Sequence, residues 1–244
     1  MKVERIEYHA GGRRFLGALV YDETSKAKRP LMLMAPNWLG VTPEAIARTA
    51  QMCGSTHVGF VACMYGDGKT CSGPPESLAL ANALRDDPAE RRLRIKAALD
   101  TLIAESEKRG IGDATRVSAV GFCFGGGNVL ELARIGANVN AVVCLHGDLT
   151  TKAAPSAPGS IKAKILVLHG SVDPAADKTQ RDALEAELDA AKANWQMLVF
   201  GGLLHSFSES ESYMAGIAEY NEPAARQSYR LLEQFIQDAF AGRL

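Results

Sequence analysis

The sequence of 244 residues is long enough for one α/β domain, and its 47% apolar residues can build a sizeable core. Its 27 basic and 28 acidic residues give a formal net charge of −1, which argues against a nucleic acid or an acidic membrane surface as partner. The charged, alternating N-terminus and the short apolar runs predict neither a signal peptide nor a membrane-spanning segment.

The chain then alternates between strand-like and helix-like patterns. Strands are expected at 3–8 and 13–21, joined by a hairpin turn at Gly11-Gly12. Six further apolar runs lack polar alternation, which is typical of strands buried on both faces. These runs are 30–36, 58–64, 116–122, 139–145, 163–170 and 194–200. Helical periodicity predicts helices at 43–53, 89–108, 124–135, 177–192 and 223–240.

This alternation predicts a doubly wound, mostly parallel sheet with helices on both faces. With no internal repeat or convincing linker, we expect a single α/β domain over residues 1–244. The basic run Arg91, Arg92, Arg94 and Lys96 lies on a helical pattern among acidic residues, and we expect it to form a solvated helix face. Ligands of such sheets bind at the carboxyl ends of the strands, so residues in those positions are the candidates for function.

One cysteine, Cys123, follows an apolar strand and precedes a helix-like pattern in the stretch "RVSAVGFCFGGGNVLELA". Gly121 and Gly125 complete the pattern G-x-C-x-G, which matches the nucleophile elbow of α/β hydrolases with sulfur in place of the hydroxyl. A sharp strand-to-helix turn requires small neighbours, and the helix start stabilises a thiolate. The backbone N–H of Phe124 is expected to help bind an oxyanion. The alternative interpretation is a buried, inert thiol.

The other cysteines lack this setting, and we interpret them as core or loop thiols. An odd total of five, without a secretion signal, indicates reduced thiols and a cytoplasmic protein. No pair has the C-x-x-C spacing typical of zinc sites, so we expect no metal. The four are Cys53, Cys63, Cys71 and Cys144.

A nucleophile elbow requires an acid and then a histidine later in the chain. Only one histidine, His205 in "GGLLHSFSE", follows the run at 194–200. Asp173 in "LVLHGSVDPAAD" is the first candidate for the acid, Asp148 is the second, and Asp177 is expected to cap the next helix. His146 and His169 end strands, where packing or hydrogen bonding is the expected role for both.

A family resemblance rests on four segments, which are "GFCFGGG", "HGSVDP", "LLHSF" and, after the third strand, "APNWLGV". In these segments the sequence resembles the dienelactone hydrolase family of the α/β hydrolases. The resemblance covers nearly the whole chain and implies the α/β-hydrolase fold. It also implies that Cys123 is the nucleophile, Asp173 the orienting acid and His205 the base. The oxyanion hole would then use the backbone N–H groups of Trp38 and Phe124.

The chain departs from the best-known members of this family at two positions. Asn37 stands where they have a glutamate that controls the charge of the cysteine, and an amide cannot take a proton from the thiol. Glu209 stands where they have an arginine for the substrate carboxylate, so an anionic lactone is a poor default substrate. Asn37 and Arg94 are the expected substrate-binding residues, although Arg91 or Arg92 could take the place of Arg94.

The sequence therefore predicts a hydrolase that cleaves a carboxylic ester, lactone or thioester of a small molecule through a Cys-His-Asp triad. No cofactor is required, and we expect a cytoplasmic monomer or small homo-oligomer that binds neither nucleic acid nor membrane. Two alternatives belong to other classes. One is a catalytically silent binding protein with the same fold, and the other is a thiol redox protein in which Cys144 approaches Cys123.

Overall fold

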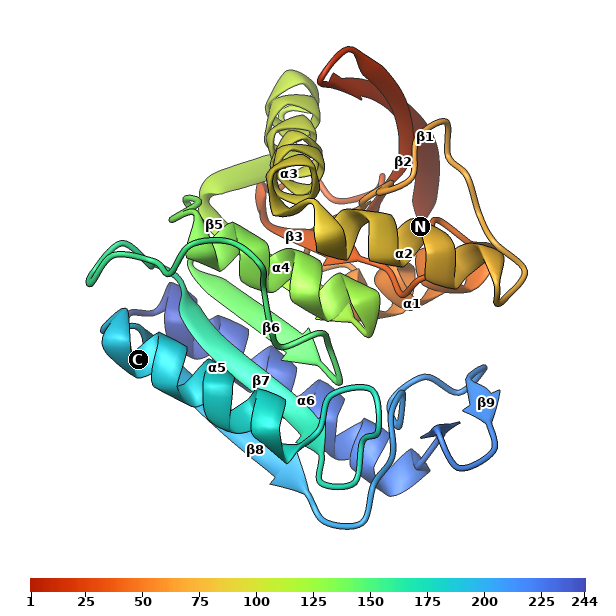
Figure 1. Cartoon of the computed structure of the whole chain (residues 1–244). Helices are drawn as coiled ribbons and strands as arrows, with labels where there is room; N and C mark the ends of the chain where they lie inside the picture. The colour runs from red at the N-terminus through yellow and green to blue at the C-terminus, as the bar shows by residue number, and fades with distance from the viewer. The chain divides into compact units, whose positions relative to one another are not determined.

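Strands and helices alternate largely as the apolar patterns predict, in a computed structural model that describes residues 1–244. The chain divides into two compact units, residues 1–119 and 120–244, and strand β5 runs from the first into the second. Figure 1 traces the path of the chain. No helix is both long enough and apolar enough to cross a bilayer.

The first unit is built on strands in the order β1-β2-β4-β3-β5. The β1–β2 hairpin pairs Lys2 with Tyr21 at one end and Ala10 with Arg13 at the other, which confirms the predicted turn between them. β2 and β4 are antiparallel, whereas β3 and β4 are parallel. The elements are β1 (Lys2–Ala10), β2 (Arg13–Tyr21), β3 (Arg29–Ala35), α1 (Pro43–Cys53), β4 (Val58–Val61), α2 (Glu76–Asp86), α3 (Pro88–Arg109) and β5 (Gly112–Phe122).

Helix α3 packs on β1, β3 and β4, and two of its arginines face the interior of the unit. Arg91 is 2% exposed and Arg94 is 6% exposed, so the expected solvated face is wrong for both. The Arg94 guanidinium bonds to the Glu90 carboxylate and the Met64 carbonyl, which makes its burial possible. Only local charges were visible in the sequence, and the Met64 carbonyl comes from a distant segment.

In the second unit, the end of β5 is followed across the sheet by β6, β7 and β8. β7 is parallel to both of its neighbours. Figure 1 shows α4 and α5 in front of these strands and α6 behind them, as a doubly wound sheet requires. The elements are α4 (Phe124–Arg134), β6 (Ala141–Leu145), β7 (Lys164–Gly170), α5 (Lys178–Ala190), β8 (Asn194–Phe200), β9 (Tyr213–Met214), β10 (Ala218–Glu219) and α6 (Glu222–Phe240).

Strand β8 corrects one prediction, because it is an edge strand rather than a strand buried on both faces. It is the last strand in the order and pairs with β7 only. Leu198 and Val199 are 37% and 40% exposed. The apolar composition of β8 indicates a strand, but it does not indicate the place of that strand in the sheet.

Two features have no counterpart in the predicted elements. Helix α2 was missed because its buried face carries Ser77, Ala81 and Leu84, with only one large apolar side chain among them. The β9–β10 hairpin consists of two-residue strands, which are too short to give a period. The other predicted strands and helices are confirmed with small shifts of their ends, the largest being the start of β5 at Gly112.

Candidate active site

Cys123 lies at a sharp turn between β5 and α4 and is the N-cap residue of α4. Its backbone has φ 52° and ψ −123°, a region that non-glycine residues rarely adopt. Gly121 permits this turn, because a Cβ atom there would lie 2.1 Å from the carbonyl oxygen of Gly125. The N–H of Cys123 donates to the carbonyl of Leu145 at 3.1 Å, which fixes the elbow to the end of β6. The turn is therefore tightly packed and strained.

The start of α4 packs against the segment that follows β6. A Cβ atom on Gly126 would lie 2.7 Å from the Cα atom of Gly147 and 2.8 Å from the sulfur of Cys144, so only glycine fits. Phe124 is the first residue of the helix, where backbone N–H groups have no partner within the helix. Such groups and the helix dipole favour negative charge at this end, next to the Cys123 thiol.

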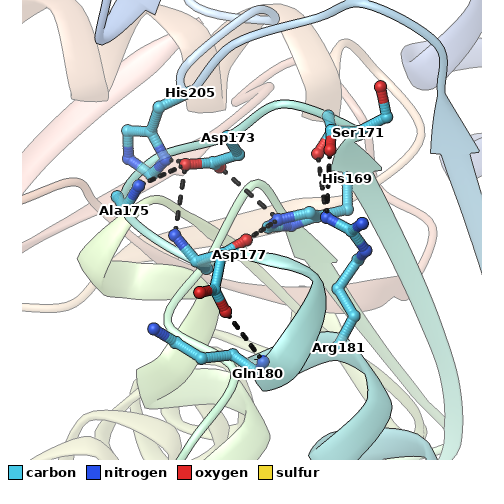
Figure 2. A network of polar contacts seen from close by, with 10 residues as sticks. His169, Ser171, Asp173, Ala175, Asp177, Gln180, Arg181 and His205 are labelled. Carbon is cyan, nitrogen blue, oxygen red and sulfur yellow. Dashed lines mark hydrogen bonds and ion pairs between the residues drawn. The ribbon is translucent and has the colours of Figure 1, made fainter.

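Asp173 lies in the loop after β7 and is 2% exposed. Its Oδ2 atom is 2.8 Å from Nδ1 of His205. Its Oδ1 atom accepts hydrogen bonds from the backbone N–H groups of Ala175 at 2.8 Å and Ala176 at 3.3 Å. Figure 2 shows the carboxylate between the His205 ring and this backbone. Both oxygens are therefore engaged, and one of them is held toward the imidazole.

Neighbouring side chains stabilise the loop that carries Asp173. His169 is buried, and its Nε2 atom is 2.8 Å from the carbonyl of Ala176 and 3.6 Å from the Asp173 carboxylate. Burial lowers the pKa of His169, although the Asp173 charge opposes this effect. Asp177 caps α5 by accepting from the N–H of Gln180, which confirms its predicted role (Figure 2). The hydrogen-bonding role expected of His169 is also confirmed.

His205 is buried, and its backbone is fixed on both sides by a neighbouring segment. Its N–H donates to the carbonyl of Ile217 at 3.0 Å, and its carbonyl accepts from Glu219 at 3.1 Å. Burial lowers the pKa of its ring, but the charge of Cys123 and hydrogen bonds to Asp173 and Cys123 outweigh burial. The pKa of His205 is therefore raised well above its ordinary value. The structure thus brings the Cys123, His205 and Asp173 side chains together.

In the first unit, Asn37 shapes its own loop. Its side-chain oxygen accepts from the N–H of Leu39 at 3.0 Å, and its carbonyl accepts from Gly40 at 3.1 Å. The carbonyl of Trp38 accepts from the Tyr65 hydroxyl at 2.9 Å. The loop after β3 is therefore held in one conformation by side-chain bonds, including one that the sequence pattern did not predict.

The structure also places the charged residues that the sequence singled out. The Arg94 guanidinium lies over the Phe15 ring at 5.4 Å, in addition to its bonds with Glu90 and Met64. Glu209, in the second unit, is completely buried, and its backbone N–H donates to the carbonyl of Ser206 at 3.0 Å. No group of three or more His, Cys, Asp or Glu side chains is arranged to hold a metal ion.

Sequence reasoning gave His146 a hydrogen-bonding or packing role, and the structure shows both. Its Nε2 atom is 2.7 Å from the Ser208 hydroxyl, and its ring lies edge-on to His205 with centroids 5.4 Å apart. Ser208 was missed entirely. The only sign of this role in the sequence was that Ser208 lies shortly after His205. Its partner His146 follows β6, which is distant in the chain.

Comparison with known proteins gives consistent matches. The model of the dienelactone hydrolase family matches residues 16–240. A solved structure described as "m3DLH" is 32% identical, with 98% of each chain covered and a TM-score of 0.90. A dienelactone hydrolase-like promiscuous phosphotriesterase, P91, from metagenomic libraries is 31% identical, with 98% of each chain covered and a TM-score of 0.89.

A named bacterial relative points to the same family. A Salmonella typhimurium protein named "Putative carboxymethylenebutenolidase" is 29% identical over 152 residues, which cover 59% of this chain and 54% of that protein. The family match spans most of the chain, and both similar structures cover nearly all of it. The chain therefore belongs to the dienelactone hydrolase family, and it is a carboxylic ester or lactone hydrolase with the α/β-hydrolase fold.

Proposed function

We propose that this protein hydrolyses neutral carboxylic esters or lactones of small molecules through a catalytic triad of Cys123, His205 and Asp173. The observation that supports this most is the run of contacts from the Asp173 carboxylate, 2.8 Å from Nδ1 of His205, to the Cys123 thiol hydrogen-bonded to the same ring. A nucleophile, a base and a group that orients the base are the parts that such a reaction needs.

The raised pKa of His205 sets the first step. In the proposed first step the imidazole ring accepts the proton of the Cys123 thiol, and Asp173 stabilises the resulting imidazolium. The thiolate attacks the ester carbonyl and forms a tetrahedral oxyanion. When this collapses, the carbon–oxygen bond breaks, and His205 gives its proton to the leaving alkoxide. The product of this half-reaction is a thioester on Cys123.

The second half-reaction releases the acid. His205, now neutral, takes a proton from water, and the hydroxide attacks the thioester carbonyl. Collapse of this intermediate expels the Cys123 thiolate and releases the carboxylic acid, and the imidazolium of His205, which holds the proton taken from water, pairs with the thiolate again. In both halves, the backbone N–H of Phe124 at the start of α4 stabilises the oxyanion, and the family resemblance assigns the second donor to Trp38.

The substrate is proposed to be neutral because Glu209 replaces the arginine that receives a carboxylate in the best-known family members. Arg94 is the first choice for a substrate-binding cation, but its guanidinium is already bonded to Glu90 and to the Met64 carbonyl. Asn37 likewise uses its side-chain oxygen within its own loop. We propose that these two residues support the shape of the substrate site rather than bind an anionic group.

The catalytic test uses a matched pair of cysteines, since Cys123 and Cys71 are each 7% exposed. Activated esters, lactones, thioesters and a neutral phosphotriester would be assayed with wild type, Cys123→Ala and Cys71→Ala. The phosphotriester is included because P91 carries that activity in its name. We expect Cys123→Ala to lower kcat/KM for esters by at least about 100-fold, and Cys71→Ala to change it less than about twofold. Equal losses in the two variants would contradict the proposal.

The same panel tests substrate charge and the two alternative functions. A neutral ester should be turned over faster than its carboxylate-bearing analogue, by about tenfold or more in kcat/KM. A silent binding protein would turn over no member of the panel. A thiol redox protein would consume peroxide through Cys123 while leaving the esters intact. We further propose that residues 1–244 act as one domain, as a cytoplasmic monomer or small homo-oligomer, since one family model spans residues 16–240.

A further inference from the structure

His146 is a buried, titratable side chain that the proposed mechanism does not use. It directly follows β6, and its ring contacts an aromatic ring of the nucleophile elbow and rings of the loop that carries His205. The ring centroid is 5.4 Å from that of His205, with planes at 70°, and 5.3 Å from that of Phe207, at 76°. It is also 6.1 Å from the ring of Phe122, the residue before Cys123. His146 therefore contacts both the base and the nucleophile elbow.

The backbone of His146 is held in an unusual conformation. Its φ of 37° is in the left-handed region, which non-glycine residues rarely occupy. Its N–H donates to the carbonyl of Leu168 in β7 at 2.7 Å. A conformation of this kind persists only where the surroundings fix it from several sides. The sheet therefore fixes the backbone position from which the His146 ring projects.

A side-chain bond joins this ring to the loop that carries His205. Nε2 of His146 is 2.7 Å from the hydroxyl of Ser208, which is also buried. The carbonyl of Ser208 accepts from the Tyr229 hydroxyl of α6 at 3.3 Å. On the other side of His146, the carbonyl of Leu145 accepts the N–H of Cys123. One short segment, 145–146, thus holds both the nucleophile elbow and the histidine loop.

We infer that His146 is a positioning residue, which fixes the plane of the His205 ring relative to the Cys123 sulfur. This inference rests on the proposed function. His205 must face sulfur in the first half-reaction and water in the second, and small misplacements of a catalytic group are costly. The edge-on contact of His146 blocks rotation of the His205 ring, and the bond to Ser208 keeps the loop from drifting away from the elbow.

The first test removes one hydroxyl, which leaves the ring of His146 and the fold in place. We expect Ser208→Ala to lower kcat for an activated ester by about fivefold or more, with KM within about twofold of wild type. Alkylation of Cys123 by iodoacetamide just below neutral pH should slow by about threefold, because the imidazolium no longer faces the sulfur. The control is Ser228→Ala, which changes a different buried serine that lies on α6. It should leave both rates unchanged.

The second test changes His146 to asparagine, which tolerates a positive φ. We expect His146→Asn to lower kcat by about tenfold or more, and the double variant with Ser208→Ala to be no slower, because the two side chains act through one bond. Comparing wild type with His205→Ala in the alkylation assay tests the Cys-His pair itself, so failure of the proposed function would be seen there. Folded Ser208→Ala and His146→Asn with wild-type kcat and wild-type alkylation pH profiles would overturn the inference.

Discussion

The Asp173–His205 hydrogen bond allows a change that removes charge while keeping the loop intact. In Asp173→Asn, the side-chain oxygen can still accept from the Ala175 N–H, as Oδ1 does at 2.8 Å. The amide nitrogen then takes the place of Oδ2, which lies 2.8 Å from Nδ1 of His205. An amide N–H facing Nδ1 forces the ring proton onto Nε2, the atom that must accept the thiol proton. The variant therefore perturbs the base without emptying the site.

The size of the effect follows from two terms. Loss of a buried hydrogen bond to a charged group costs about 1.5–3 kcal/mol, which is a factor of about 10–150 in rate. The wrong tautomer adds to this, so we expect kcat/KM for an activated ester to fall by about 100- to 10,000-fold. Asp173 also raises the pKa of His205, so its loss lowers that pKa. The alkaline limb of the pH–rate profile, where the imidazolium is lost, should therefore move to lower pH.

The assay is steady-state hydrolysis over a range of pH, with thermal unfolding to show that the variant is folded. Asp177→Asn is a matched control, since Asp177 caps α5 from the same loop and asparagine is an equally good cap. We expect this control to stay within about twofold of wild type. A folded Asp173→Asn enzyme with wild-type kcat/KM and an unmoved alkaline limb would refute the role given to Asp173.

Three further predictions follow from the elbow and its charges. Gly121→Ala, which places a Cβ atom 2.1 Å from the Gly125 carbonyl, should abolish activity and lower the melting temperature, whereas Gly201→Ala, which meets open space, should leave both unchanged. The contacts that raise the pKa of His205 also stabilise the folded state, and this stabilisation is complete at a pH below the ordinary pKa of histidine. The free energy of unfolding should therefore fall as pH rises through the raised pKa, as urea titrations would show. His205→Gln should flatten that dependence. Iodoacetamide should label Cys123 faster than Cys71 near neutral pH, because burial raises the pKa of Cys71; equal rates by peptide mapping would contradict this.

Local sequence was sufficient for the features that depend on short segments. The elbow needs only a strand, Gly121, Cys123, Gly125 and a helix, and all of these lie within one continuous stretch. The pairing of Asp173 with His205 was also predictable, since the chain order of the fold leaves one histidine after the last large strand. The structure places these two side chains in direct contact, whereas their catalytic roles stay a proposal.

Features that depend on partners from distant segments were not predictable. Arg94 looked like a surface charge because its partner, the Met64 carbonyl, lies in the distant loop that follows β4. The exposure of Leu198 depends on β8 being the edge of the sheet, which composition alone does not indicate. The contact of His146 with Ser208 needs β6 beside the histidine loop. In each case the residue could be identified in the sequence, but the sequence did not show which distant segment would lie next to it.

The most direct test of the mechanism is to trap the covalent intermediate. The protein would be mixed with an activated ester, quenched in acid, and analysed by intact mass and peptide mapping. The mechanism predicts one acyl group per chain, carried as a thioester on the peptide that contains Cys123 and lost on treatment with hydroxylamine. Rapid hydrolysis with no acyl group on Cys123 at any quench time, or with the same turnover by Cys123→Ala, would contradict it.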